Sequence, residues 1–69
     1  MNLKTISQFH KEQIHHLQNA IWNLERAEEN IKYAKGNPNL EKVYLANIEC
    51  IKDDLQDDIN NIFAESDND

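Results

Sequence analysis

The fold is decided by the segment KYAKGNPNLE at residues 32–41, which holds the only glycine and the only proline of the chain. Gly36 suits the position just after a helix, where a left-handed backbone favours glycine. Pro38 suits the first turn of a helix, where its missing N–H is not needed, and Asn37 or Asn39 is suited to capping that helix. The segment therefore predicts a turn between two helices, and so short a connection makes them antiparallel.

Apolar residues recur at helical spacing on both sides of this turn, which is predicted at 36–39. Before the turn they predict a helix at about residues 5–35, with Thr5 as the N-cap and Gln8 completing a capping box. After it they predict a helix at about residues 38–64. The first stripe comprises Ile6, Phe9, Ile14, Leu17, Ala20, Ile21, Leu24, Ala27 and Ile31. The second comprises Leu40, Tyr44, Leu45, Ile48, Ile51, Leu55, Ile59, Ile62 and Phe63.

The expected fold class is all-α, with one antiparallel two-helix hairpin forming a single domain over residues 1–69. The acidic tail at 65–69 has nothing to pack against and is predicted to be disordered. Two helices touch along one line, so a hairpin covers each apolar stripe only in part. The chain is short, and its one cysteine, Cys50, cannot form an internal disulfide. We therefore expect assembly into a dimeric four-helix bundle or a higher helical oligomer.

The net charge of −6 is unevenly distributed along the chain. Residues 1–36 contain five basic and four acidic residues, whereas residues 37–69 contain two basic and nine acidic residues. The second half is therefore expected to repel nucleic acid and acidic membranes. No apolar run approaches the roughly 18–20 residues that span a bilayer, and the first residues lack the apolar stretch of a signal peptide. These features predict a cytoplasmic protein without a membrane partner.

A dimerising helical hairpin with an acidic tail resembles, in architecture, the small plasmid-encoded RNA-binding Rop proteins, and this resemblance implies RNA as a ligand. Phosphatases of sporulation response regulators are also short helical hairpins. Their Ser-Gln-Glu-Leu-Asp signature is absent here, because Ser7-Gln8 is followed by Phe9-His10. Certain phage proteins that sequester cyclic oligonucleotides are similar in plan, which implies a nucleotide as another ligand. Such a compact acidic chain also suits a phage- or mobile-element-encoded protein.

One sector of the first helix combines aromatic and basic residues, roughly opposite the apolar stripe. It contains Lys4, Lys11, His15, Trp22, Arg26, Glu29 and Tyr33. Tryptophan, tyrosine and arginine are enriched in binding hot spots, and aromatic residues also stack on nucleic-acid bases. The candidate partner-binding residues are therefore Lys11, His15, Trp22, Arg26 and Tyr33. Two alternatives stay open for Trp22: it closes the core of the oligomer, or it is an isolated exposed aromatic residue.

Carboxylates gather on the second helix, where Glu49, Asp53, Asp54 and Asp57 form a candidate acidic face. Carboxylates arrayed along a helix are suited to mimicking nucleic-acid phosphates in the cleft of another protein, and a solvated surface is the plainer interpretation. General acid–base catalysis needs a carboxyl group held in an apolar pocket, which the surface of two helices does not offer. No enzymatic activity is therefore expected.

Metal and cofactor sites are not expected either. His10, His15 and His16 point in three directions from one helix, so they cannot bind one ion without a second chain. A single glycine excludes a Gly-rich phosphate loop. His10 and Glu28 fall within the apolar stripe of the first helix. Glu28 is interpreted either as a side chain that reaches solvent at the stripe edge or as a polar residue that sets helix register.

These features together predict a small non-enzymatic regulator or inhibitor that binds another macromolecule, expected to be a protein, through a helical face. The alternative is an oligomeric sponge for a small anionic ligand such as a nucleotide, or a Rop-like RNA binder, acting through the basic and aromatic face of the first helix. An assembly adaptor with a purely structural role is a third hypothesis.

Overall fold

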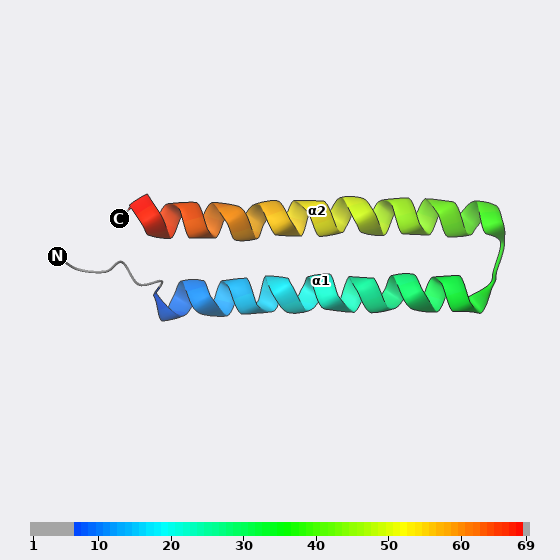
Figure 1. Ribbon diagram of the computed structural model, residues 1–69, viewed down its shortest axis with the longest axis horizontal. Coiled ribbons are helices and arrows are strands. Elements are labelled where there is room, and N and C mark those ends of the chain that lie inside the picture. The colour runs from blue at the N-terminus through cyan, green and yellow to red at the C-terminus, as the bar shows by residue number, and fades with distance from the viewer. Residues whose placement is uncertain (1–6, 69) are drawn as a thin grey trace.

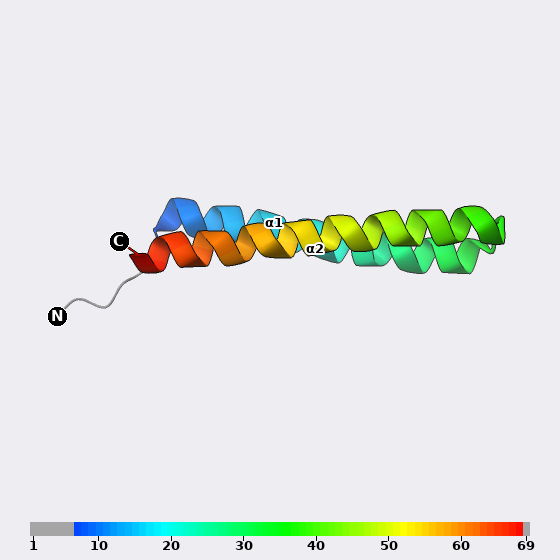
Figure 2. The same ribbon diagram turned by 90° about the horizontal axis from the view of Figure 1, so that it is seen from above.

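The computed structural model describes residues 7–68, with the side chains of residues 7–65. The described residues form two α-helices, α1 (Gln8–Ala34) and α2 (Pro38–Asn68), which lie side by side and are joined by a short turn (Figure 1). The view from above shows the two helices crossing at a shallow angle (Figure 2). Helices of 27 and 31 residues are about 40 and 46 Å long. The prediction of an all-α antiparallel hairpin is confirmed.

The start of α1 differs from the prediction. Ser7 is the N-cap, because its Oγ accepts a hydrogen bond from the backbone N–H of His10 at 3.1 Å. The Ser7 Oγ also forms a hydrogen bond of 2.8 Å with Nδ1 of His10. Gln8 is therefore the first residue of the helix and completes no capping box, while Thr5 lies outside the described residues. A serine that satisfies a free N–H of the first turn fixes the start of a helix, which explains the later beginning.

The end of α1 is marked by a left-handed residue, but this residue is Lys35 and not the predicted Gly36. Lys35 has φ 51° and ψ 47°, whereas Gly36 does not have a positive φ. Asn37 then caps α2, because its Oδ1 accepts from the backbone N–H of Asn39 at 2.9 Å. Pro38 occupies the first position of α2, as the sequence predicts.

The end of α2 also differs from the prediction. The helix continues to Asn68, past residue 64 and through most of the segment 65–69 that was predicted to be disordered. This segment contains neither glycine nor proline, so no residue in it forces the helix to end. Asp69 lies outside the described residues.

The two helices meet along a narrow seam whose residues alternate at spacings of three and four, as in coiled coils. On α1 the seam comprises His10, Ile14, Leu17, Ile21, Leu24, Glu28 and Ile31. On α2 it comprises Glu41, Leu45, Ile48, Lys52, Leu55, Ile59 and Ile62. Among residues 7–65 only Ile21 and Ile59 are buried, and the rest of the seam is partly covered. The core is thin because each helix covers only one side of the other.

A polar pair interrupts the seam and joins the two helices. Nζ of Lys52 donates to Oε1 of Glu28 at 2.7 Å, and the two side chains are only 15% and 16% exposed. A second carboxylate, that of Glu49, lies 3.2 Å from the same Nζ. The hydrogen bond from Lys52 lowers the pKa of Glu28, and the same bond raises the pKa of Lys52. Glu28 is thus a paired seam residue, which supports its role in setting the register of the helices.

Candidate functional site

The basic and aromatic residues selected from the sequence form one row on the outer surface of α1. Lys11, His15, Trp22, Arg26 and Tyr33 are spaced by four, seven, four and seven residues. Three turns of helix take about 11 residues, so this spacing produces a nearly straight row. All five side chains are exposed, and Trp22 and Tyr33 expose 52% and 78% of their surface. Trp22 is therefore not part of the core of the hairpin.

This row, called here the Trp22 row, is an extended strip and not a pocket. It covers about 33 Å along α1 at ~1.5 Å per residue. Within residues 7–65 neither Lys11 nor Arg26 forms an ion pair. A hydrogen bond of 3.3 Å joins Nε2 of His15 to Nδ2 of Asn19, one helical turn further along α1. Lys4, which the sequence pattern assigned to the same sector, lies outside the described residues.

The predicted acidic face lies on α2. Glu49, Asp53, Asp54 and Asp57 are all exposed, and Glu49 contacts the Lys52 ammonium group described above. Among residues 7–65 no hydrogen bond or ion pair joins these carboxylates to the Trp22 row. The two candidate surfaces are thus separate, and the structure does not bring them together into one site.

A third surface, which the sequence pattern had merged with the core stripes, flanks the seam. Tyr44 and Ile51 each expose 47% of their surface, and Leu40 exposes 49%, although all three belong to the predicted apolar stripe of α2. On α1 the corresponding flank carries small residues. This surface is called here the apolar face and is defined by Ala20, Ala27, Ala34, Leu40, Tyr44 and Ile51.

The seam register explains why these residues share one side of the hairpin. Ala20 and Ala27 each directly precede a seam residue of α1, and Tyr44 and Ile51 each directly precede a seam residue of α2. In an antiparallel pair of helices, these residues of one helix lie on the same side of the seam as the corresponding residues of the other helix. The sequence signal that could have identified this face is the spacing of the seam residues by three and four positions. This spacing is kept only if the polar residues Glu28 and Lys52 are counted as seam residues.

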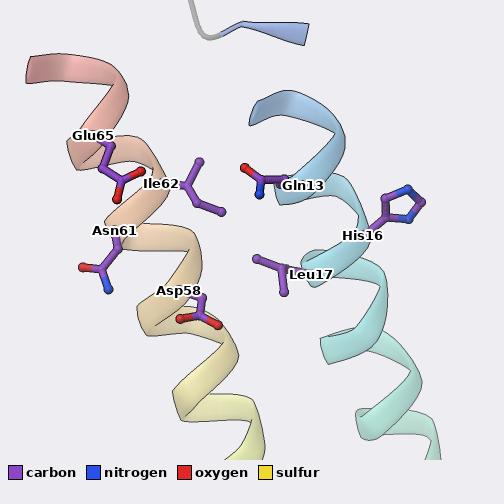
Figure 3. Close-up of a pocket in the computed structure, with 7 residues that line it drawn as sticks. All are labelled: Gln13, His16, Leu17, Asp58, Asn61, Ile62 and Glu65. Atoms are coloured by element: carbon purple, nitrogen blue, oxygen red, sulfur yellow. The ribbon is translucent and has the colours of Figure 1, made fainter. Parts of the chain in front are cut away.

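Two open grooves confirm that the seam is uncovered on this side. The groove near the turn has a volume of about 230 Å³, and Ala34, Leu40 and Tyr44 line it together with the seam residue Ile31. The groove near the chain ends has a volume of about 620 Å³ (Figure 3). There, Leu17 and Ile62 extend toward each other between the helices, while His16 points away from α2. The remaining wall residues of this second groove are Gln13, Asp58, Asn61 and Glu65.

The opposite flank of the seam has a different chemistry. Its residues each directly follow a seam residue: Lys11, Gln18, Glu25 and Lys32 on α1, and Lys42, Glu49, Gln56 and Phe63 on α2. All but Phe63 are polar or charged. The hairpin therefore has one broad face that is apolar near the turn and polar near the chain ends, and a second broad face that is polar along most of its length. The Trp22 row lies at the outer edge of the second face.

Comparison of the chain with protein families, with curated proteins and with solved structures finds no match. Within the described part of the chain, no group of three or more His, Cys, Asp or Glu residues is placed to hold a metal ion. In the same part, no helix is long and apolar enough to cross a membrane. Cys50 is a free, exposed cysteine.

Proposed function

We propose that the protein is a non-enzymatic regulator or inhibitor that assembles as a dimeric four-helix bundle and binds another protein through the Trp22 row. The observation that carries this proposal is the half-exposed indole of Trp22, which lies in a straight row with an arginine and an even more exposed tyrosine. Tryptophan, tyrosine and arginine are the residues most enriched in binding hot spots. A solvent-facing helix surface gains no folding stability from them.

A protein partner is favoured over nucleic acid by the charge of the whole molecule. The net charge is −6, and the second half of the chain carries nine acidic residues. The electrostatic field of this negative charge repels nucleic acid at long range. The two basic side chains in the row, Lys11 and Arg26, do not suffice to attract nucleic acid against this repulsion. The aromatic side chains contribute through contact area and desolvation, which are independent of the sign of the partner's charge.

The dimer is supported by the thin core of the hairpin. With only two buried residues among residues 7–65, the chain leaves large apolar side chains half exposed. Small domains without disulfides or metals commonly obtain the missing burial from a second chain. Pairing two hairpins is the simplest way to cover such a surface.

The proposed function is tested by quantitative affinity capture with wild-type protein and with the Trp22→Ala variant, using lysate of the source organism. We expect a stoichiometric protein partner whose affinity for the variant falls about 30-fold, the loss typical of a hot-spot residue. Val43→Ala is the matched control, because Val43 is equally exposed but lies on the outer surface of α2. Circular dichroism and light scattering check that helix content and oligomer size are the same in both variants as in the wild type.

Two results would contradict this proposal. Equal recovery of the partner by wild type and Trp22→Ala would place the contact elsewhere, with the acidic face at Glu49, Asp53, Asp54 and Asp57 as the next surface to test. Loss of the oligomer in Trp22→Ala would make Trp22 a residue of the assembly and not of a partner-binding surface.

A second candidate function is the capture of a small anionic ligand or RNA by the same row. It is favoured by Lys11 and Arg26, which form no ion pair within residues 7–65 and lie beside exposed aromatic side chains. Native mass spectrometry of gently purified protein would reveal a bound nucleotide as an added mass. Binding of RNA would have to weaken steeply with salt, and salt-independent binding would exclude this candidate.

A further inference from the structure

We infer that the apolar face is the surface on which a second copy of the chain packs, with the two-fold axis running along the length of the hairpin. In this arrangement α1 of each protomer lies on α2 of the partner, and both turns are at the same end of the bundle. The inference rests on the proposed dimer but not on the proposed partner protein. It assigns a specific face and axis to that dimer.

The area of the face matches what a dimer needs. The hairpin face is about 40 Å long, the length of α1, and about 20 Å wide, as expected for two packed helices. The whole broad face therefore offers ~800 Å², which is the area that each partner contributes to an interface of standard size. The apolar face occupies its half near the turn, and Gln13, Asp58 and Glu65 line the half near the chain ends. The opposite broad face has the same dimensions, but among the residues named above that flank its seam only Phe63 is apolar, so it would bury polar and charged residues along most of its length.

Side-chain size makes the apolar face complementary to itself. Glu28 pairs with Lys52, and this contact fixes which residues of the antiparallel helices lie at the same level. On this register Ala27 lies within about 3 Å of the level of Ile51, and Ala34 is equally close to the level of Tyr44. A two-fold axis along the hairpin preserves these levels. Small residues of one α1 then face large residues of the other α2 in the two layers nearest the turn, so the surfaces interdigitate there, whereas the next layer places Ala20 beside Asp58.

Charge distribution selects the same axis. A two-fold axis across the hairpin would place α2 directly on α2 of the partner and bring the Asp58 carboxylates of two acidic helices together. The axis along the hairpin places the two α2 helices on a diagonal instead. Each α2, which has two basic and eight acidic residues, then has as neighbours two copies of α1, which has three basic and four acidic residues and is much less acidic. The two strongly acidic helices are thereby kept apart in the bundle.

The face is tested by sedimentation equilibrium of wild type, Ile51→Asp and Val43→Asp. Ile51 and Val43 are both about half exposed on α2, but only Ile51 belongs to the apolar face. We expect a wild-type dimer and an Ile51→Asp dissociation constant raised at least ~100-fold, because each dimer would bury two carboxylates without partners. Val43→Asp should remain dimeric. A dimer that survives Ile51→Asp, or that is broken by Val43→Asp, would overturn the assignment of the face.

The axis is tested by disulfide cross-linking, which does not depend on a disruptive variant. Ala27→Cys and Ile51→Cys are made separately, each with Cys50→Ser, and one of the two is isotopically labelled. After mixing and mild oxidation, we expect mixed disulfide dimers that join Cys at position 27 to Cys at position 51. Disulfide dimers of Ile51→Cys with itself would instead show that α2 packs on α2 and would overturn the proposed axis.

The proposed function and this inference fail in different ways. A wild-type protein that is monomeric at all accessible concentrations would overturn the inference, while the loss of partner capture by Trp22→Ala could still be observed. If such a monomer lost its captured partner through Ile51→Asp, the occupant of the apolar face would be that partner and not a second copy.

Discussion

Among the residues that the structure describes, Lys35 is the one non-glycine residue with a positive φ. It adopts the left-handed conformation at the end of α1, with φ 51°, while the glycine that follows it does not use a positive φ. An L-residue adopts this conformation at a cost of about 1–2 kcal/mol, whereas glycine adopts it freely. The conformation of Lys35 therefore lowers the stability of the hairpin relative to a turn with glycine at this position.

We predict that Lys35→Gly raises the free energy of unfolding by about 0.5–1 kcal/mol. This value is the steric cost that is relieved minus the entropic cost of the greater flexibility of glycine in the unfolded chain. Urea denaturation at fixed protein concentration measures this change. Gly36→Ala is the matched comparison, because a Cβ added to Gly36 meets nothing within 4 Å and its φ is ordinary. If Gly36→Ala were the destabilising change and Lys35→Gly had no effect, the left-handed residue would be Gly36.

Glu28 and Lys52 form the seam contact most sensitive to pH. The pKa of Glu28 is lowered from its ordinary value of 4.5 by the hydrogen bond from Lys52, so its carboxylate stabilises the folded state above that pH. This contribution is lost as the pH falls through the lowered value. The pKa of Lys52 is raised from 10.5 by the same hydrogen bond, so its contribution is complete below 10.5 and is lost at higher pH.

We predict that Glu28→Gln lowers Tm at pH 7 and that the difference in Tm from wild type shrinks as the pH falls below about 4.5. Thermal unfolding followed by circular dichroism at pH 7, 5 and 3 measures this trend. Glu29→Gln provides the control, because Glu29 is exposed and makes no ion pair within residues 7–65. A difference in Tm that is constant over this pH range would mean that the Glu28 carboxylate does not stabilise the hairpin through its charge.

At the scale of the helices, the sequence is informative about the turn and less so about the helix ends. The only glycine and the only proline locate the turn, and Pro38 and Asn37 have the positions that their chemistry predicts. Ser7 replaces Thr5 as the cap because several polar residues near the start can each satisfy a free N–H of the first turn. Such competition depends on small energy differences that one sequence does not reveal.

Of the candidate surfaces, one could be predicted from the sequence and one could not. The Trp22 row lies where helical periodicity predicts it, because positions on a single helix depend only on its regular geometry. The apolar face was missed because Tyr44 and Ile51 are apolar like the core and fall within the same broad stripe. What separates the seam from its flank is the contact of Lys52 with Glu28, and these two residues are 24 positions apart in the sequence, beyond the reach of local periodicity.

At the scale of the whole molecule, folding and association are expected to be linked. The hairpin alone buries few side chains, so a second copy that binds only the folded chain adds directly to its stability. With an unfolding enthalpy of ~0.7 kcal/mol per residue over both chains, we predict that Tm rises about 5 °C for each tenfold increase in protein concentration. Differential scanning calorimetry over two decades of concentration measures this slope.

The Ile51→Asp variant gives the control for this measurement, because its Tm should be lower and independent of concentration. A wild-type Tm that does not change with concentration would indicate that the hairpin folds without a second chain. The thin core described above would then be sufficient on its own.

The position of Trp22 also gives the protein an optical reporter. It is the only tryptophan of the chain, and its indole is half exposed on the side of α1 away from the core. We therefore expect its fluorescence in the folded protein to resemble that of a solvated indole, and its emission wavelength to change less on unfolding than that of a buried tryptophan. A shift of the emission to shorter wavelength, or protection from an aqueous quencher, would report contact at the Trp22 row without any label.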